Sequence, residues 1–210
     1  MKNGLFIFTG AFATLALSWA GVVLTAHNQL GSLTQYKDPV DDALYPQPLT
    51  GLADQGRQVY QDLGCVTCHT QQVRREGFGS DIARKWGTRQ SVARDYIREK
   101  TVLIGSSRMG PDLRNVGART YADAEYFYKI LYSPGQLAHG MPAYPFLFEV
   151  RPVGSVQSSH KSIQVIANGQ EIVPTRRAQA LVAYLLSLKD TYDYPEAKPF
   201  VETEKKEGGH

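Results

Sequence analysis

The stretch Cys65-Val66-Thr67-Cys68-His69 decides the fold of this 210-residue chain. Two thiols three residues apart, followed directly by an imidazole, form the attachment motif of a c-type haem. The two cysteines can form thioethers to the vinyl groups of one porphyrin, which places His69 beneath the iron as an axial ligand. The chain contains no other cysteine. The motif therefore predicts one covalently bound haem c.

Two other uses of this cysteine pair fit the sequence less well. A thioredoxin-like dithiol lies between a strand and a helix of a βαβ unit, and no such pattern surrounds the motif. A structural zinc site needs a second pair of ligands, and the chain has neither a second Cys-x-x-Cys nor a paired histidine motif. Haem attachment is therefore the favoured interpretation.

The length and charge of the chain narrow its class. With 210 residues and a net charge of +3, it can build one sizeable core and gives no sign of binding nucleic acid. Basic residues gather between positions 74 and 119, where acidic residues interrupt them. We expect this basic region to be a solvated face, with contact to haem propionates or to an acidic partner surface as the alternative.

The N-terminal segment predicts a membrane anchor. Residues 4–26 carry no formal charge, and as a helix they would reach roughly 34 Å, enough to cross a hydrocarbon core of ~30 Å. A cleaved signal peptide is the alternative, but its apolar region is usually shorter, and Leu24-Thr25-Ala26 is a poor cleavage site. Lys2 precedes the segment and Asp38, Asp41 and Asp42 follow it. The positive-inside rule therefore places the N-terminus in the cytoplasm.

Composition divides the rest of the chain into three parts. Residues 27–50, with three prolines, are expected to form an extended linker that lifts the next domain off the membrane. Residues 51–190 are expected to form a cytochrome c domain. Residues 191–210 are rich in Pro, Lys and Glu and are expected to be a disordered tail.

Apolar residues at helical spacing predict a helix on each side of the domain. One runs from Leu52 to Leu63, where Gly64 ends it, and the other is capped by Thr175 and continues to Leu188. A small residue at Gly56 permits the two helices to cross tightly. A first and a last helix crossing beside the haem resemble the arrangement of class I cytochromes c.

The second axial ligand must come from elsewhere in the chain. The candidates are Met109, Met141, His27, His139 and His160. Met109 directly precedes Gly110-Pro111-Asp112-Leu113, which resembles the proximal loop of class I cytochromes, where the proline carbonyl accepts the N–H of the proximal histidine. Met141 begins Met141-Pro142-Ala143-Tyr144-Pro145, which resembles the distal loop and which prolines would stiffen. Met141 is the preferred ligand, and His139 is the main alternative.

Several stretches, in order, resemble subunit II of cbb3-type haem-copper cytochrome c oxidases, the membrane-anchored mono-haem subunit. They are Gly56-Arg57-Gln58-Val59-Tyr60, the haem motif, Gly105-Ser106-Ser107-Arg108 with Gly110-Pro111-Asp112-Leu113, Val116-Gly117-Ala118-Arg119, Leu131-Tyr132-Ser133-Pro134, the Met141 stretch and Leu181-Val182-Ala183-Tyr184-Leu185. The resemblance spans most of residues 4–190.

The resemblance implies a role for the haem site and a set of partners. Cys65 and Cys68 would hold one haem c between the axial ligands His69 and Met141, with Pro111, Leu113 and Tyr144 also in the haem environment. Electrons would arrive from a soluble cytochrome c or a di-haem cytochrome c subunit and leave to the catalytic haem-copper subunit. The chain would cross the bacterial inner membrane once and contact its lipid. Its haem domain would be periplasmic, where bacteria attach such haems.

The segment 148–174 departs from that family. Residues 163–166 and 171–173 flank Asn168-Gly169, a strong hairpin signal. The expected fold is therefore mainly α, with one N-terminal transmembrane helix and a class I-like cytochrome c domain that carries a small β-hairpin insertion.

Three functions remain open at this point. The first is a redox subunit of a terminal oxidase that is not catalytic alone, and the second is a free-standing membrane-anchored cytochrome c. The third is a peroxidase or gas sensor with five-coordinate iron, which requires that Met141 does not bind.

Overall fold

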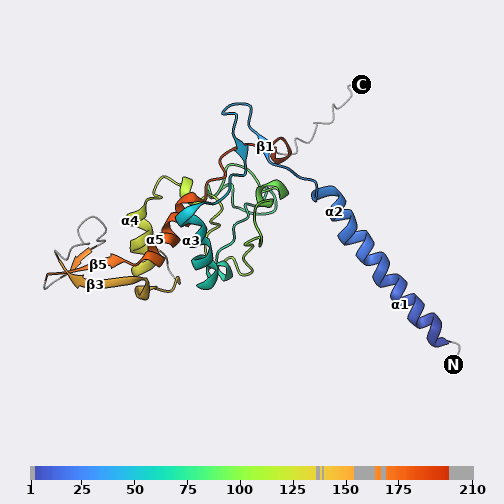
Figure 1. The fold of residues 1–210 in the computed structure, drawn as a ribbon, viewed down its shortest axis with the longest axis horizontal. Coiled ribbons are helices and arrows are strands. Elements are labelled where there is room, and N and C mark those ends of the chain that lie inside the picture. Colours follow the sequence, from blue (N-terminus) through green and yellow to red (C-terminus); the bar gives the residue numbers. More distant parts are fainter. Residues whose placement is uncertain (1–2, 136–137, 139, 154–163, 167–168, 199–210) are drawn as a thin grey trace, which may run out of the picture.

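A long N-terminal helix projects from the rest of the molecule (Figure 1). This computed structural model describes residues 3–135, 138, 140–153, 164–166 and 169–198. Helices α1 (Asn3–Trp19) and α2 (Thr25–Leu30) join through a π-helical turn at Ala20–Leu24. Among the described residues, the helix Asn3–Leu30 is the one that is long and apolar enough to cross a membrane. It contains the predicted span 4–26.

The linker is more ordered than expected. Helix α2 continues to Leu30, and strands β1 (Tyr36–Lys37) and β2 (Leu44–Tyr45) then pair antiparallel. The side chains of Asp38 and Asp41 accept hydrogen bonds from backbone amides two residues further along, at 2.7 and 2.9 Å. These bonds close a turn, as Asp does in many loops. The expectation of an extended spacer over residues 27–50 is therefore wrong for this hairpin.

Two helices cross at the centre of the domain, as the sequence predicts. They are α3 (Gly51–Asp62) and α5 (Arg176–Ser187). A Cβ atom on Gly56 would lie 1.8 Å from the carbonyl oxygen of Ala180, so only glycine permits this approach. Gly64, with a φ of 70°, follows α3, and the Thr175 hydroxyl accepts a hydrogen bond from the Ala178 amide at the start of α5.

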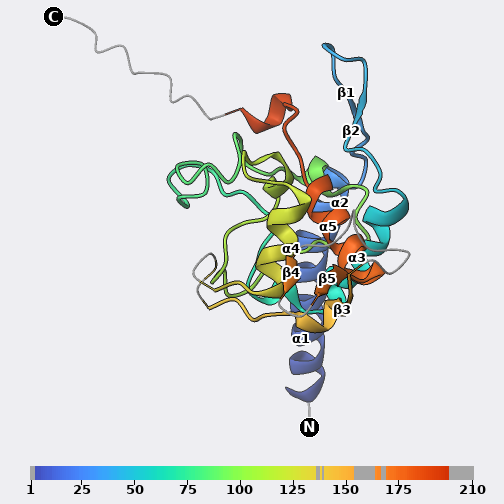
Figure 2. The same ribbon diagram turned by 90° about the vertical axis from the view of Figure 1, so that its left-hand side faces the viewer.

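A third helix and a small sheet extend the domain away from the anchor. Helix α4 (Ala124–Tyr132) begins at its cap Asp123 and packs against α5. Strands β3 (Phe148–Pro152), β4 (Gln164–Ile166) and β5 (Gln170–Pro174) form an antiparallel sheet in the order β3-β5-β4. Figure 2, which views the molecule from the sheet end, shows the helices behind the strands.

The sheet occupies the segment in which the sequence predicts a hairpin. Gln164 pairs with Ile172 and Ile166 with Gln170, and Gly169 has a φ of 67°. Asn168 lies outside the described residues. Strand β3, which pairs with β5 from Phe148 to Pro152, was not expected.

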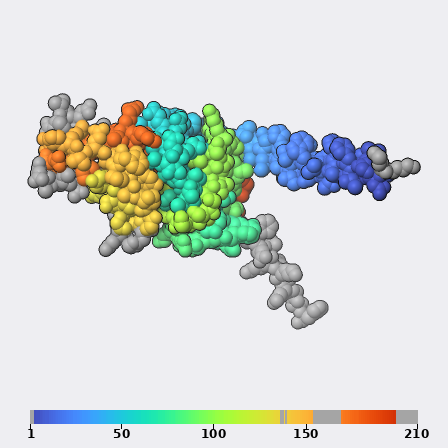
Figure 3. Space-filling view, turned by 90° about the horizontal axis from the view of Figure 1, so that it is seen from below, coloured from blue at the N-terminus to red at the C-terminus, as the bar shows by residue number. Residues whose placement is uncertain are grey.

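The C-terminal segment packs against the domain as far as the structure describes it. Tyr194 and Ala197 are buried, and a short 3-10 helix covers Pro195–Ala197. The expectation of disorder from residue 191 is therefore wrong for 191–198, because buried aromatic rings outweigh the polar composition of the segment. The expected disorder of residues 199–210 concerns a part outside the described residues. Figure 3 shows the domain as one continuous body from which the N-terminal helix projects.

The arginines of the basic region are mostly paired inside the domain. Arg114 contacts Glu99 at 2.5 Å and also Asp190, and Arg89 contacts Asp95 at 2.8 Å. The side chains of Arg114 and Arg89 are only 5% and 9% exposed. The expected solvated face is therefore wrong for these residues, which hold loops together instead.

Candidate haem-binding site

The haem motif folds into a single tight turn. A 3-10 helix covers Cys65–Thr67, and the carbonyl oxygen of Cys65 accepts hydrogen bonds from the amides of Cys68 and His69, at 3.3 and 3.0 Å. Gly64 enters this turn in the left-handed conformation. Both thiols are free. The turn therefore brings two thiols and one imidazole together within five consecutive residues.

The Cys65 thiol is in a sheltered position. Burial raises its pKa to about 11, and the hydroxyl of Tyr144 is hydrogen-bonded to it. A thiol with such a pKa stays protonated at neutral pH and resists unwanted oxidation and metal binding. Tyr144 belongs to the predicted distal loop, so this contact brings that loop to the haem motif.

The His69 ring is held in one orientation. Its Nδ1 lies 2.9 Å from the carbonyl oxygen of Pro111, which can only accept, so Nδ1 carries the proton and Nε2 is left as a ligand atom. Burial lowers the pKa of His69, which favours the neutral, metal-binding form. A Cβ atom on Gly110 would lie 2.3 Å from Cε1 of the ring. Glycine and proline together therefore seat the imidazole.

Backbone hydrogen bonds join the proximal loop to the haem motif across the sequence. The amide of Gly110 donates to Cys68 at 3.0 Å, and the amide of Leu113 donates to Thr70 at 2.8 Å. A further bond runs from the amide of Gln71 to Leu103 at 3.0 Å. Leu113 itself is buried in the hydrophobic core. The support beneath His69 is thus made by two segments more than thirty residues apart.

Asp112 is a functional neighbour that the sequence analysis missed. Its carboxylate is fully buried and accepts hydrogen bonds from the amides of Gln72 and Arg114, both at 2.8 Å. Burial raises its pKa to about 6. It ties the proximal loop to the haem motif. The available signal was the Pro-Asp pair, since Asp often bonds to the amide two residues further on in a turn.

The candidates for the second axial ligand lie in different surroundings. Met141 is half-buried and packs against the hydrophobic core together with Cys65 and Tyr144. Met109 is 78% exposed, and His27 is exposed on α2. His139 and His160 lie outside the described residues.

The donor set fits a covalently attached haem. Two free thiols can form thioethers, a neutral imidazole offers Nε2, and a thioether side chain packs on the same core. The described residues contain no group of three or more His, Cys, Asp or Glu that could hold a bare metal ion.

Comparison with known proteins agrees with this chemistry. The family model for the cytochrome c oxidase mono-haem subunit, FixO, matches residues 6–170, which is most of the chain. No curated protein sequence matches the chain significantly. The chain belongs to the FixO family, the mono-haem subunit of cbb3-type cytochrome c oxidases.

Proposed function

We propose that this chain passes single electrons through one covalent haem c towards the oxygen-reducing subunit of a cbb3-type oxidase. The observation that carries the proposal is the His69 ring, fixed by the Pro111 carbonyl directly after the only two cysteines of the chain. When bound, haem c supplies one-electron chemistry between ferric and ferrous iron. The chain takes part in catalysis only as a redox subunit.

The proximal residues hold the group and tune its imidazole. Cys65 and Cys68 would provide the two thioether links, so the porphyrin cannot leave. The bond from His69 Nδ1 to Pro111 increases the basicity of the ring and leaves Nε2 as the atom that can bind iron. Because Gly110 has no side chain, the ring can lie directly against the backbone of the proximal loop.

Met141 would complete the coordination. A thioether favours ferrous iron and raises the reduction potential relative to a second imidazole. If His69 and Met141 both hold the iron, no position would remain for oxygen or peroxide, as an electron-transfer site requires and a peroxidase or gas sensor does not. His139, two residues away, is the alternative ligand.

The proposed topology places the two ends of the anchor on opposite sides of the bacterial inner membrane. Lys2 precedes the apolar helix, and Asp38 and Asp41 follow it, which favours a cytoplasmic N-terminus. The haem domain would then be periplasmic. There it would receive electrons from a soluble cytochrome c or a di-haem cytochrome c subunit and pass them to the catalytic haem-copper subunit.

A free-standing anchored cytochrome c is the second candidate function. Purification of the tagged chain from its native membranes in mild detergent separates the two. We expect a multi-haem catalytic subunit in fixed stoichiometry and oxygen uptake that cyanide inhibits. A lone six-coordinate haem c, in a detergent shown to preserve other respiratory complexes, would support the anchored shuttle instead.

A further inference from the structure

The chain that leaves the membrane helix is fastened to the domain by four tyrosines. Tyr45 stacks on Tyr192 with ring centroids 4.1 Å apart, and Tyr36 meets the edge of Tyr194 at 5.6 Å. Tyr192 and Tyr194 contact each other at 5.2 Å. Two of these rings come from the β1–β2 hairpin and two from the C-terminal segment. We call this set the tyrosine clamp.

Arg89 anchors the clamp to the interior of the domain. Its guanidinium carbon lies 5.3 Å from the Tyr192 ring and 4.8 Å from the Tyr194 ring. Its Nε donates to the carbonyl oxygen of Tyr192 at 2.7 Å, and its other nitrogens pair with the buried Asp95. A charge this well buried and paired is costly to displace, so the C-terminal half of the clamp is rigid.

Two further arginines hold the hairpin side. Arg94 pairs with Glu196 at 2.5 Å and also donates to the carbonyl oxygen of Thr34. Arg98 donates to the side chain of Gln35 at 2.8 Å. Charge-assisted hydrogen bonds of this kind are stronger than neutral ones. These two bonds hold Thr34 and Gln35, which lie just before strand β1.

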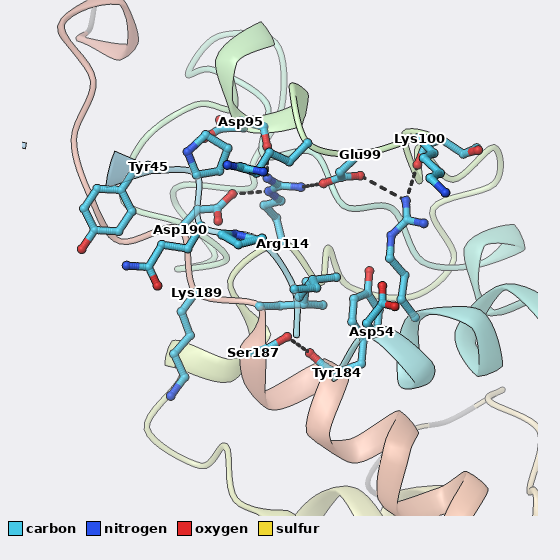
Figure 4. A pocket seen from close by; sticks show the side chains of 18 of the residues that line it. Tyr45, Asp54, Asp95, Glu99, Lys100, Arg114, Tyr184, Ser187, Lys189 and Asp190 are labelled. Carbon is cyan, nitrogen blue, oxygen red and sulfur yellow. Dashed lines mark hydrogen bonds and ion pairs between the residues drawn. The ribbon is translucent and has the colours of Figure 1, made fainter. Parts of the chain in front are cut away.

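The residues that lie next to the clamp, around Asp190, are also held by contacts with the core. Tyr45 borders a cleft of about 650 Å³ in which Arg114 lies between Glu99 and Asp190 (Figure 4). The amide of Asp190 donates to the side chain of Asn115 at 2.8 Å. The residues that lead into Tyr192 are therefore tied to the core on both sides.

Little free chain separates the clamp from the membrane helix. Helix α2 ends at Leu30, and the first fastened residue is Thr34. The three residues between them can span at most ~11 Å when extended. A segment this short limits how far the clamp can move away from the end of α2.

We infer that the tyrosine clamp fixes the orientation of the haem domain relative to its membrane helix. A fixed orientation suits a subunit that faces one acceptor and does not suit a domain that swings between complexes. The consequence for electron transfer rests on the proposed function, whereas the orientation itself can be measured independently of haem.

The test measures a distance between the helix and the domain. Spin labels on Gln29→Cys in α2 and Ala124→Cys at the start of α4, both exposed positions, report the separation by pulsed electron paramagnetic resonance. The full-length chain with attached haem is used, in nanodiscs of phosphatidylethanolamine and phosphatidylglycerol. We expect one narrow distance distribution.

Two variants loosen the junction in different ways. The double change Tyr36→Ala with Tyr45→Ala removes the half-buried hairpin rings and leaves the buried Tyr194 in place. A flexible Gly-Ser insertion after Leu33 keeps every clamp contact but separates the clamp from α2. Both should widen the distribution at least about twofold. Tyr121→Ala, which removes an exposed tyrosine from another part of the domain, should leave it narrow.

The outcomes are distinct. A broad distribution in the unmodified chain, or a double tyrosine variant as narrow as Tyr121→Ala, would overturn the inference. The haem spectrum and reduction potential should be the same in all variants, because the clamp acts on orientation alone. Haem content, scored by the pyridine haemochrome spectrum, reports separately on the proposed function.

Discussion

The two sides of the haem motif are built differently. On the proximal side, backbone hydrogen bonds connect residues far apart in sequence, such as Gly110 with Cys68 and Leu113 with Thr70. In the described part of the distal loop, the amide of Ala138 donates to Pro134 and that of Met141 to Ala138, while the bond from the amide of Tyr144 to Leu131 spans thirteen residues.

The two predicted iron ligands, His69 and Met141, are therefore supported to different degrees by the rest of the domain. The His69 ring is oriented by its hydrogen bond to Pro111 and packs closely against Gly110. Within the described residues, the amide of Met141 donates to its near neighbour Ala138, and its side chain packs against the hydrophobic core. Loss of Met141 should therefore change the coordination of the iron and leave the fold intact. A change next to His69 should alter both the coordination of the iron and the stability of the fold.

The largest effect is expected where covalent attachment is lost. Replacement of both thiols, Cys65→Ser with Cys68→Ser, should abolish covalent haem, because the vinyl groups then have no partner. Haem staining after denaturing electrophoresis measures this directly. A haem signal that survives denaturation in the double variant would contradict the predicted attachment.

The next effect concerns the distal side. Met141→Ala should open the sixth coordination position, so that carbon monoxide binds without denaturation while the haem stays attached. The reduction potential should fall by at least about 80 mV, which is a tenth of the ~0.8 V range over which axial ligands set it. Optical spectra and potentiometric titration measure both.

Met109 provides the matched control for this change. Met109→Ala removes the same side chain from a position that is 78% exposed, and it should alter neither spectrum nor potential. An unchanged spectrum and potential in Met141→Ala would refute Met141 as the ligand and direct attention to His139.

A third prediction contrasts one glycine from each side. Gly110→Ala would place a Cβ atom 2.3 Å from the His69 ring, whereas Gly140→Ala meets no atom within 4 Å but must keep a φ of 82°. We expect Gly110→Ala to lower the free energy of unfolding by about 3 kcal/mol or more. Gly140→Ala should cost only about 1 kcal/mol.

Denaturant unfolding of the haem-containing protein measures the two glycine variants. Their haem spectra provide a second readout, since only the Gly110 change should disturb the proximal ligand. Equal losses of stability in the two variants would show that the proximal side is no more rigid than the distal one.

The last prediction is the pH dependence of stability due to Asp112. Burial raises its pKa from 3.8 to about 6, so between these values the unfolded chain ionises first and folding is disfavoured. The free energy of unfolding therefore falls by up to about 3 kcal/mol as pH rises from 3.8 to about 6.

Asp112→Asn isolates this contribution. The variant loses one hydrogen-bond acceptor at every pH, but it should regain stability relative to the unmodified protein between pH ~4 and ~6 and then stay level. Urea unfolding across this pH range measures the difference in free energy of unfolding between the variant and the unmodified protein. The titration of neighbours such as Asp81 occurs in both proteins and therefore cancels from this difference. A constant difference at all pH values would mean that the carboxyl has an ordinary pKa.

The elements that the sequence predicts well are those with local causes. The crossing helices α3 and α5 follow from apolar spacing and from the cap at Thr175, and both are confirmed. The bond from His69 to Pro111, expected from the resemblance to class I cytochromes, is present at 2.9 Å. Met141 as axial ligand stays a prediction.

The errors fall where distant segments meet. Composition alone made residues 27–50 look like a spacer and residues 191–198 like a disordered tail. Each segment is polar by itself, but Tyr45 and Tyr192 stack on each other and Arg89 donates to the carbonyl oxygen of Tyr192.

The sequence by itself determined the haem motif, the membrane helix and the two crossing helices, because each depends on residues within a few turns of one another. Only the tertiary structure decided how the proximal loop supports His69, where the buried arginines find their carboxylates, and that the linker is fastened to the domain. Those contacts join residues that are far apart in the chain, and no local periodicity or composition records which of them will meet.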